Sequence, residues 1–211
     1  MPFRDNGCTI PYRGMASDLN GCLGGIPAEQ RLNIYALVIY ISDPLGSFLD
    51  EVRRELVPHY NPHAHVSVLP PRPLAVSWQK ASAEAAALTA DWEPFDVELT
   101  DIGVFPVTGV VYIEVGRGSE ELRRMHAAMN TTSLGFQEPF AYHPHITLAQ
   151  ELRLDEVSAV QEQAFRKWRE YDGRRGFRAE RAVFVQNSLT DHWIDLVEFQ
   201  LGGAPHPTLR G

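Results

Sequence analysis

Two stretches of this sequence share one arrangement of side chains: "HAHVSVL" at residues 63–69 and "HPHITLA" at residues 143–149. Each reads His-x-His-x-Ser/Thr and continues with aliphatic residues, and the copies lie 80 residues apart. Alternate side chains of a β-strand share one face. The pattern therefore predicts two short strands, each with a polar face of His, His and Ser/Thr and an aliphatic face that packs in a core.

The composition is that of a globular protein, with 44% hydrophobic and 22% charged residues among 211. This length allows one sizeable core, or two small lobes that share one. The formal net charge of −8 argues against a protein that coats nucleic acid non-specifically, because such binding needs a broad basic surface. It leaves room for a pocket that binds one phosphate.

One segment is basic. Residues 166–181 contain seven Lys/Arg and three Asp/Glu, an excess of four positive charges. A solvated helix end followed by a basic loop explains this excess. The alternative is a surface that receives an RNA or nucleotide tail.

Residues 1–30 are rich in Gly, Asn and Pro, so we expect a flexible extension before a single bilobal domain at 31–211. Cys8 and Cys22 are the only cysteines, too few for a zinc cluster by themselves. The apolar run at 34–41 is too short to span a bilayer, and the N-terminus has no signal-peptide pattern. We therefore expect a cytoplasmic protein that does not bind membranes.

From residue 31 the hydrophobic pattern becomes regular. It predicts helices at 44–57 and near 77–90, and further helices that begin at Ser119 and Asp155. Asp43 is the expected N-cap of the first helix, before Pro44. Strands are predicted at 31–41, 96–106, 109–116, 181–188 and 192–199, besides the two motifs. Each half thus offers a helix, a motif strand, a helix and a strand pair, which suggests an α+β fold of two similar lobes with mostly antiparallel sheets.

If an approximate two-fold axis relates the lobes, the two polar strand faces look at each other across a cleft. Histidine has an ordinary pKa near 6.5, so one copy can start neutral and the other protonated. That is what paired general base and general acid catalysis requires. The Ser and Thr hydroxyls can donate hydrogen bonds to an oxyanion. A phosphodiester attacked in line fits this symmetry.

The paired motifs resemble the signature of the 2H phosphoesterase superfamily. "HVSVLPPRPL" and "YHPHITLAQ" look particularly like its bacterial branch of 2′-5′ RNA ligases or RNA 2′,3′-cyclic phosphodiesterases. The resemblance extends from about Leu32 to Leu201, because the order of helices and strands also agrees. It implies a bilobal fold with the active site in the groove between the lobes.

Carried over to this chain, the resemblance implies catalytic roles for His65 and His145 and for the hydroxyls of Ser67 and Thr147. The implied reaction is metal-independent opening of a 2′,3′-cyclic phosphate, in which one histidine activates water and the other protonates the departing ribose oxygen. Run backwards, the same arrangement can join a 2′-5′ linkage. Relatives that produce 2′-phosphates favour His145 as the base and His65 as the acid. We expect a monomer without a cofactor, acting on a small nucleotide or a short RNA end with a cyclic phosphate.

The chain departs from the resemblance in one charge. Relatives often carry a basic residue just after the second motif, where this chain has Gln150. Arg72, after the first motif, is a candidate to supply that charge to the phosphate. Phe105 and Tyr142 are candidates to stack on a base or a sugar.

Two other functions remain open from the sequence. The two His-x-His pairs could ligate zinc, although neither motif has a nearby Asp, Glu or Cys at usual ligand spacing and the hydroxyls would then be unexplained. Alternatively, the same fold could be a non-catalytic module that binds a nucleotide or an RNA end. Another small phosphodiester, such as an ADP-ribose cyclic phosphate or a 2′-5′ oligonucleotide, is also compatible.

Overall fold

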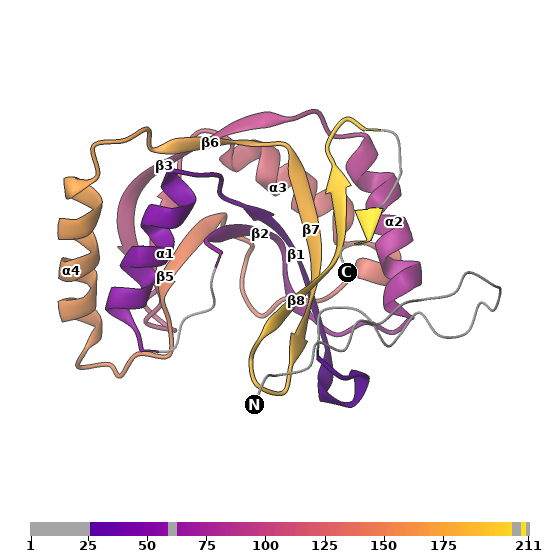
Figure 1. Cartoon of the computed structure of the whole chain (residues 1–211), viewed down its shortest axis with the longest axis horizontal. Helices are drawn as coiled ribbons and strands as arrows, with labels where there is room; N and C mark the ends of the chain where they lie inside the picture. Colours follow the sequence, from indigo (N-terminus) through magenta and orange to yellow (C-terminus); the bar gives the residue numbers. More distant parts are fainter. Residues whose placement is uncertain (1–25, 59–62, 204–207, 210–211) are drawn as a thin grey trace, which may run out of the picture.

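The computed structural model describes residues 26–58, 63–203 and 208–209, which form two antiparallel sheets and four α-helices. The five-stranded sheet has the order β2 (His65–Arg72), β1 (Arg31–Tyr40), β7 (Arg181–Ser188), β8 (Trp193–Gln200) and β9 (Thr208–Leu209). The four-stranded sheet has the order β5 (His145–Ala149), β4 (Val111–Val115), β3 (Phe95–Val104) and β6 (Gly176–Ala179). The predicted α+β fold with two sheets is confirmed (Figure 1).

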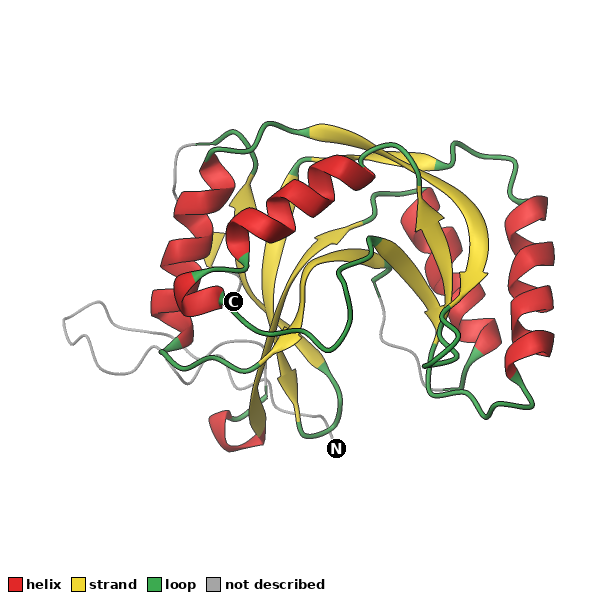
Figure 2. Cartoon of the chain, turned by 180° about the vertical axis from the view of Figure 1, so that it is seen from behind, coloured by secondary structure: helices red, strands yellow, loops and turns green. Residues whose placement is uncertain are grey.

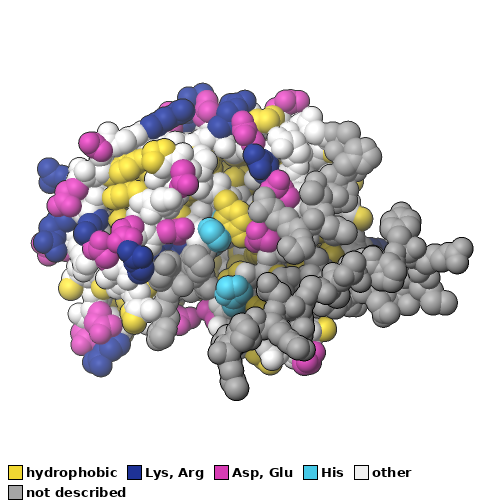
Figure 3. All heavy atoms as spheres, viewed as in Figure 1, with side chains coloured by type: hydrophobic (Ala, Val, Ile, Leu, Met, Phe, Trp, Pro, Cys, Tyr) yellow, Lys and Arg dark blue, Asp and Glu magenta, His cyan; other side chains and the backbone are white. Residues whose placement is uncertain are grey.

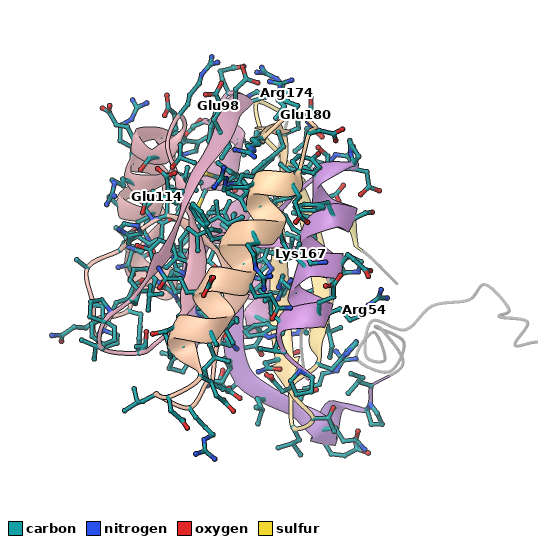
Figure 4. The ribbon with its side chains drawn as sticks, turned by 90° about the vertical axis from the view of Figure 1, so that its left-hand side faces the viewer. Arg54, Glu98, Glu114, Lys167, Arg174 and Glu180 are labelled. Carbon is teal, nitrogen blue, oxygen red and sulfur yellow. The ribbon has the colours of Figure 1, made fainter. Side chains whose placement is uncertain are left out.

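The helices lie in two groups on opposite sides of the strands (Figure 2). They are α1 (Leu45–Leu56), α2 (Trp78–Ala90), α3 (Ser119–Met129) and α4 (Val157–Glu170). In α1, buried Leu45, Leu49, Val52 and Leu56 recur at intervals of three and four residues, which gives the helix one apolar face. α1 and α4 lie side by side, and Lys167 Nζ is 2.7 Å from Glu55 Oε2 between them (Figure 4).

Each sheet takes strands from both halves of the chain, which differs from the expectation that each half forms one lobe. β3 and β4 follow the first motif but pair with β5 and β6. β7 and β8 follow the second motif but return to pair with β1. Hydrophobic patterning predicts strands but not their partners, because pairing depends on contacts distant in sequence.

The helices cross between the sheets in the same reciprocal way. α1 links β1 to β2 but packs against β5, whereas α3 links β4 to β5 but packs against β2. β2 and β5, the two motif strands, each lie at one end of their sheet and contact each other. This crossing brings the two motifs together.

β1 is buried on both faces and separates the core from the cavity described below. Leu37 and Ile39 pack in the main core, which extends through both sheets. Ala36 and Val38 point the other way and form a second small cluster with Val183 and Val185. From Tyr35 to Ile39 the strand is therefore buried on both faces, as expected for a central strand covered on both sides.

Three details of the predicted elements are corrected. The N-cap of α1 is Pro44; the carboxylate of Asp43, one residue earlier, accepts hydrogen bonds from the backbone N–H and hydroxyl of Ser47. α4 begins at Val157 rather than at Asp155, with Glu156 as its N-cap. The helical spacing of Val157, Val160, Ala164, Phe165 and Trp168 predicts that they share one side of this helix, but Phe165 is 44% exposed.

The basic segment at 166–181 contains a strand that the sequence did not predict. β6 is four residues long and pairs with β3. Its Arg178 contacts Asp96 and the carbonyl of Pro94. Part of the segment is therefore a sheet edge whose charge is matched by neighbouring acids.

The predicted N-terminal extension is described only from residue 26. Residues 1–25, which include both cysteines, lie outside the described residues. Ile26 packs against the core, and Ala28–Gln30 forms the 3₁₀-helix η1. None of the helices in the described ranges has the length and apolar composition needed to cross a membrane.

Candidate active site

From His65 and His145 onward the two motifs alternate between a polar face and a buried face, as predicted, but the first histidine of each motif, His63 or His143, lies before its strand. On β2, Val66 and Val68 are fully buried while His65 and Ser67 are partly exposed. On β5, His145 and Thr147 are partly exposed between buried Ile146 and Leu148; all four exposed motif side chains line one cavity. β5 begins directly after Pro144, which cannot donate to a strand ladder.

The cavity has a volume of about 890 Å³, which is the size of a small-molecule site. One wall is the strand face that carries Val38 and Tyr40 of β1. Further lining residues come from the β3–β4 turn and from the loop before β5. On the face shown in Figure 3, histidine side chains lie near the centre, beside hydrophobic and acidic side chains.

His65 and His145 are oriented by hydrogen bonds of the same kind. Nδ1 of His65 lies 2.8 Å from the carbonyl oxygen of His63, and Nδ1 of His145 lies 2.7 Å from the carbonyl oxygen of His143. A carbonyl oxygen only accepts, so Nδ1 must carry the hydrogen in each ring. Nε2 is then the nitrogen that exchanges a proton with a ligand.

The surroundings of His65 strongly favour its neutral form. Burial lowers the pKa of His65 to about 4, although the hydrogen bond to the His63 carbonyl acts in the opposite direction. The guanidinium of Arg53, on α1, lowers the pKa further because it repels a second positive charge. The ring of Tyr40 stands edge-on to His65, with centroids 6.2 Å apart.

His145 has a different electrostatic partner. Burial lowers the pKa of His145 as well, and the hydrogen bond to His143 opposes this effect. The nearby carboxylate of Glu114 favours the protonated form, whereas His143 disfavours it. Glu114 Oε2 is 2.9 Å from His143 Nε2, so β4 also holds the residue whose carbonyl orients His145.

The chain that enters each motif strand is fixed by a helix. Asp50 of α1 accepts hydrogen bonds from the backbone N–H groups of His63 and Ala64, at 3.0 and 2.8 Å. Arg123 of α3 donates to the carbonyl of Tyr142 at 2.9 Å. Helices from the two halves thus set where both polar strand faces begin.

Arg72 does not reach the cavity, which corrects its predicted role as a phosphate ligand. Its side chain is only 2% exposed and forms an ion pair with Glu138. It also donates to the Asn130 side chain at 2.7 Å and to the Leu134 carbonyl at 3.0 Å. These bonds occupy a buried guanidinium, which must be paired to be tolerated. Arg72 therefore supports the fold at the end of β2.

Phe105 and Tyr142 both line the cavity. Phe105 stacks on Tyr112 at 4.2 Å and meets His145 edge-on at 4.9 Å. Tyr142 stacks on His126 at 3.9 Å, and its hydroxyl donates to the Ser67 carbonyl at 2.7 Å. The hydroxyl of Tyr142 thus ties the second motif to the first.

Several residues near the motifs carried no signal in the sequence. Arg53 and Asp50 lie beside the first motif, and Glu114 beside the second. Buried His126 accounts for the stacking on Tyr142 and places its Nδ1 2.8 Å from the Val68 carbonyl. Arg53 lies among the buried residues of a helix and Glu114 among those of a strand. Their positions beside the histidines therefore depend on how distant segments pack, which the sequence pattern does not show.

The described residues do not offer the ligands that the alternative of a zinc site requires. Within residues 26–58, 63–203 and 208–209, no group of three or more His, Cys, Asp or Glu side chains could hold a metal ion. His143, one member of the second His-x-His pair, is occupied by Glu114. Gln150, where relatives were expected to carry a basic residue, does line the cavity.

Comparison with known sequences agrees with this arrangement. A family model described as the 2′-5′ RNA ligase superfamily matches residues 41–190. A Bacillus licheniformis protein with a provisional assignment as a phosphoesterase is 28% identical over 135 residues, covering 60% of this chain and 76% of that protein. One with the same assignment from Oceanobacillus iheyensis is 24% identical over 135 residues, covering 60% and 75%.

Solved structures share the fold. Escherichia coli LigT in its apo form superimposes with a TM-score of 0.54 at 17% identity, covering 82% of this chain and 98% of that one. The same protein in complex with 3′-AMP gives 0.53 at 16% identity, covering 82% and 99%. At this identity the likeness establishes the arrangement of helices and strands.

Proposed function

The chain belongs to the 2′-5′ RNA ligase superfamily, and from this premise we propose that it is a metal-independent phosphodiesterase that opens 2′,3′-cyclic phosphates of nucleotides or RNA ends. The observation that carries the proposal is the pair of histidines in one cavity, each with Nδ1 bonded to a carbonyl and Nε2 left for proton transfer. The provisional assignment of the curated relatives as phosphoesterases supports it.

In the proposed reaction, Nε2 of one histidine takes a proton from water while the water oxygen bonds to phosphorus. The bond from phosphorus to one ribose oxygen breaks, and that oxygen receives a proton from Nε2 of the other histidine. Ser67 and Thr147 donate hydrogen bonds to the non-bridging oxygens as charge develops on them. The product is a nucleoside 2′- or 3′-monophosphate. When a hydroxyl of a second end replaces water as the nucleophile, the same opening of the cyclic phosphate joins the two ends, and the released ribose oxygen again receives the proton.

The electrostatics favour His65 as the base and His145 as the acid, opposite to the assignment that the resemblance suggested. A base must start neutral, and Arg53 disfavours the protonated form of His65. An acid must start protonated; burial lowers the pKa of His145 overall, and the carboxylate of Glu114 opposes this effect. The two neighbours thus divide the roles of otherwise similar histidines.

Turnover of 2′,3′-cyclic nucleotides and cyclic-phosphate RNA ends in excess EDTA tests the proposal. The wild-type protein is compared with His65→Ala and His145→Ala, and the products are resolved as 2′- or 3′-monophosphates. Activity that survives EDTA and is lost in both variants supports it. Activity abolished by EDTA assigns the site to a metal, and tight binding without turnover indicates a binding module.

We further propose that the protein acts as a monomer, because one chain supplies both histidines and both hydroxyls of the cavity. Sedimentation of the active protein tests this. A concentration-dependent change in specific activity would contradict it.

A further inference from the structure

The first motif strand, β2, lies at one end of its sheet, and β1 is the strand that pairs with it among the described residues. A strand in this position presents backbone groups that no neighbouring strand bonds. Two side chains bond to carbonyls of this strand. The hydroxyl of Tyr142 donates to the Ser67 carbonyl at 2.7 Å, and Nδ1 of His126 lies 2.8 Å from the Val68 carbonyl. Two successive carbonyls of the first motif are thus held by side chains from outside its sheet.

The two rings that hold these carbonyls form one unit. Tyr142 and His126 are parallel, with an angle of 4° between their planes and centroids 3.9 Å apart. Nδ1 of His126 must carry the hydrogen, because a carbonyl oxygen only accepts. Burial raises the pKa of Tyr142, so its hydroxyl keeps its proton while the histidines titrate. Both rings therefore act as donors to β2.

Tyr142 is itself fixed by α3. His126, whose ring stacks on it, belongs to this helix, and Arg123, about one turn earlier, donates to the Tyr142 backbone carbonyl at 2.9 Å. α3 packs against β2. Because both the ring and the backbone of Tyr142 are held, the position of its hydroxyl follows that of α3.

A second connection lies at the far end of β2. Nε2 of His126 is 3.6 Å from Oε1 of Glu138, and Glu138 pairs with Arg72, the last residue of β2. Glu138 and Tyr142 belong to the same loop before β5. This loop is therefore bonded to β2 at two places, through Tyr142 in the middle of the strand and through Glu138 at its end.

Tyr142 joins the two halves of the cavity over a short path. It stands three residues before His145 in the chain, and its hydroxyl bonds the backbone of Ser67, whose side chain lines the same cavity. A group that stabilises a transition state must be placed to within about 0.5 Å. The bond from Tyr142 fixes where the Ser67 hydroxyl lies relative to the second motif.

Resting on the proposed function, we infer that Tyr142 is a positioning residue, whose hydroxyl holds the Ser67 backbone where the Ser67 side chain can donate to the phosphate. This role differs from stacking on a base or a sugar, because His126 already covers one face of the Tyr142 ring. It acts through Ser67, and it makes the first motif depend on a side chain that enters with the second.

Tyr142→Phe removes the hydroxyl and keeps the ring. We expect it to lower kcat for uridine 2′,3′-cyclic phosphate by about tenfold with KM nearly unchanged, because charge on the phosphate oxygens develops in the transition state. The matched control is Tyr171→Phe. The Tyr171 hydroxyl is buried without a hydrogen-bond partner among the described residues, and Tyr171 is not among those that line the cavity, so this change breaks no such bond. A raised KM with unchanged kcat, or an equal loss in both variants, overturns the inference.

A double-mutant cycle tests whether Tyr142 acts through Ser67. In Ser67→Ala the donor is already absent, so adding Tyr142→Phe should have almost no further effect on kcat. In Thr147→Ala the Ser67 donor remains, and adding Tyr142→Phe should again lower kcat by about tenfold. An equal further loss in both backgrounds overturns the inference, because it indicates direct contact of Tyr142 with the substrate or a general effect on the fold.

Amide hydrogen exchange separates this inference from the catalytic proposal, because it needs no substrate. Tyr142→Phe should speed exchange of the amides at 66–69 by about fivefold, since β2 loses a bond, whereas Tyr171→Phe should leave it unchanged. If the wild-type protein turns over no cyclic phosphate, the proposed function fails, while faster exchange in Tyr142→Phe still supports the hold of Tyr142 on β2. Unchanged exchange in Tyr142→Phe contradicts the inference and leaves the proposed function standing.

Discussion

The first and second motifs hold their histidines in the same way but place them in different electric fields. Each histidine donates through Nδ1 to the carbonyl two residues earlier. The residues just before each motif strand are held by a helix that packs against the other motif strand. The first motif lies beside Arg53, and the second lies beside Glu114. Repetition thus sets geometry, and the neighbouring charges distinguish two groups of one chemical type.

The largest effects come from the histidines themselves. His65→Ala and His145→Ala should each lower kcat/KM for a cyclic phosphate by about 10² to 10⁴-fold. An aryl phosphodiester distinguishes the acid from the base, because its leaving group needs no proton. With that substrate His145→Ala should lose far less activity than His65→Ala. Steady-state kinetics with both substrates checks this, and the reverse order exchanges the two roles.

The motif strands also differ at their ends, where β2 has Arg72 and β5 has Ala149. Arg72→Met removes the guanidinium that pairs with Glu138, which keeps only His126 Nε2 at 3.6 Å, and should reduce the free energy of unfolding by about 3–5 kcal/mol. Urea denaturation measures this, and adding Glu138→Gln should restore part of the loss. A raised KM with an unchanged free energy of unfolding would instead indicate that Arg72 binds the phosphate.

The low pKa of His65 makes the first motif the more acid-sensitive one. Its pKa of about 4 lies below the ordinary value of 6.5, so the unfolded chain takes up a proton first as pH falls. The contribution of neutral His65 to the free energy of unfolding is therefore fully present above pH 6.5 and is lost as the pH falls from 6.5 to 4. His65→Gln should remove about 2 kcal/mol of that loss, allowing for the partial exposure of the ring. Urea denaturation across this range checks it; an equal loss in both proteins contradicts it.

The smallest effect concerns the pH dependence of activity. kcat/KM should be bell-shaped, with its acidic limb near pH 4 from His65 and its alkaline limb below pH 6.5 from His145. Glu114 favours protonated His145, so Glu114→Gln should move the alkaline limb lower by about half a pH unit. Glu180→Gln is the control and should move neither limb. An unmoved limb in Glu114→Gln contradicts the role of this carboxylate.

The sequence predicted what depends on local periodicity. Alternation along a strand was enough to place His65 with Ser67 and His145 with Thr147 on polar faces, and helical spacing located four helices. It failed where the partner is distant. Arg72 looked free for a phosphate because its partners, Asn130, Leu134 and Glu138, lie 58 to 66 residues away.

The charges that distinguish the two motifs were unpredictable for the same reason. Arg53 sits on the buried side of α1, and Glu114 alternates with buried residues of β4. Neither residue lies near its histidine in the sequence. β6 escaped prediction because four residues with a glycine carry too little hydrophobic pattern.

The exchange of strands between the halves also constrains the order in which the protein can be made. β1 is apolar on both faces, yet its second neighbour, β7, begins only at residue 181. During synthesis β1 and β2 can pair early, but the other edge of β1 stays open until most of the chain has left the ribosome. An apolar strand with an open edge is prone to aggregate. The same crossing that assembles the cavity thus leaves the nascent protein dependent on its last strands for protection.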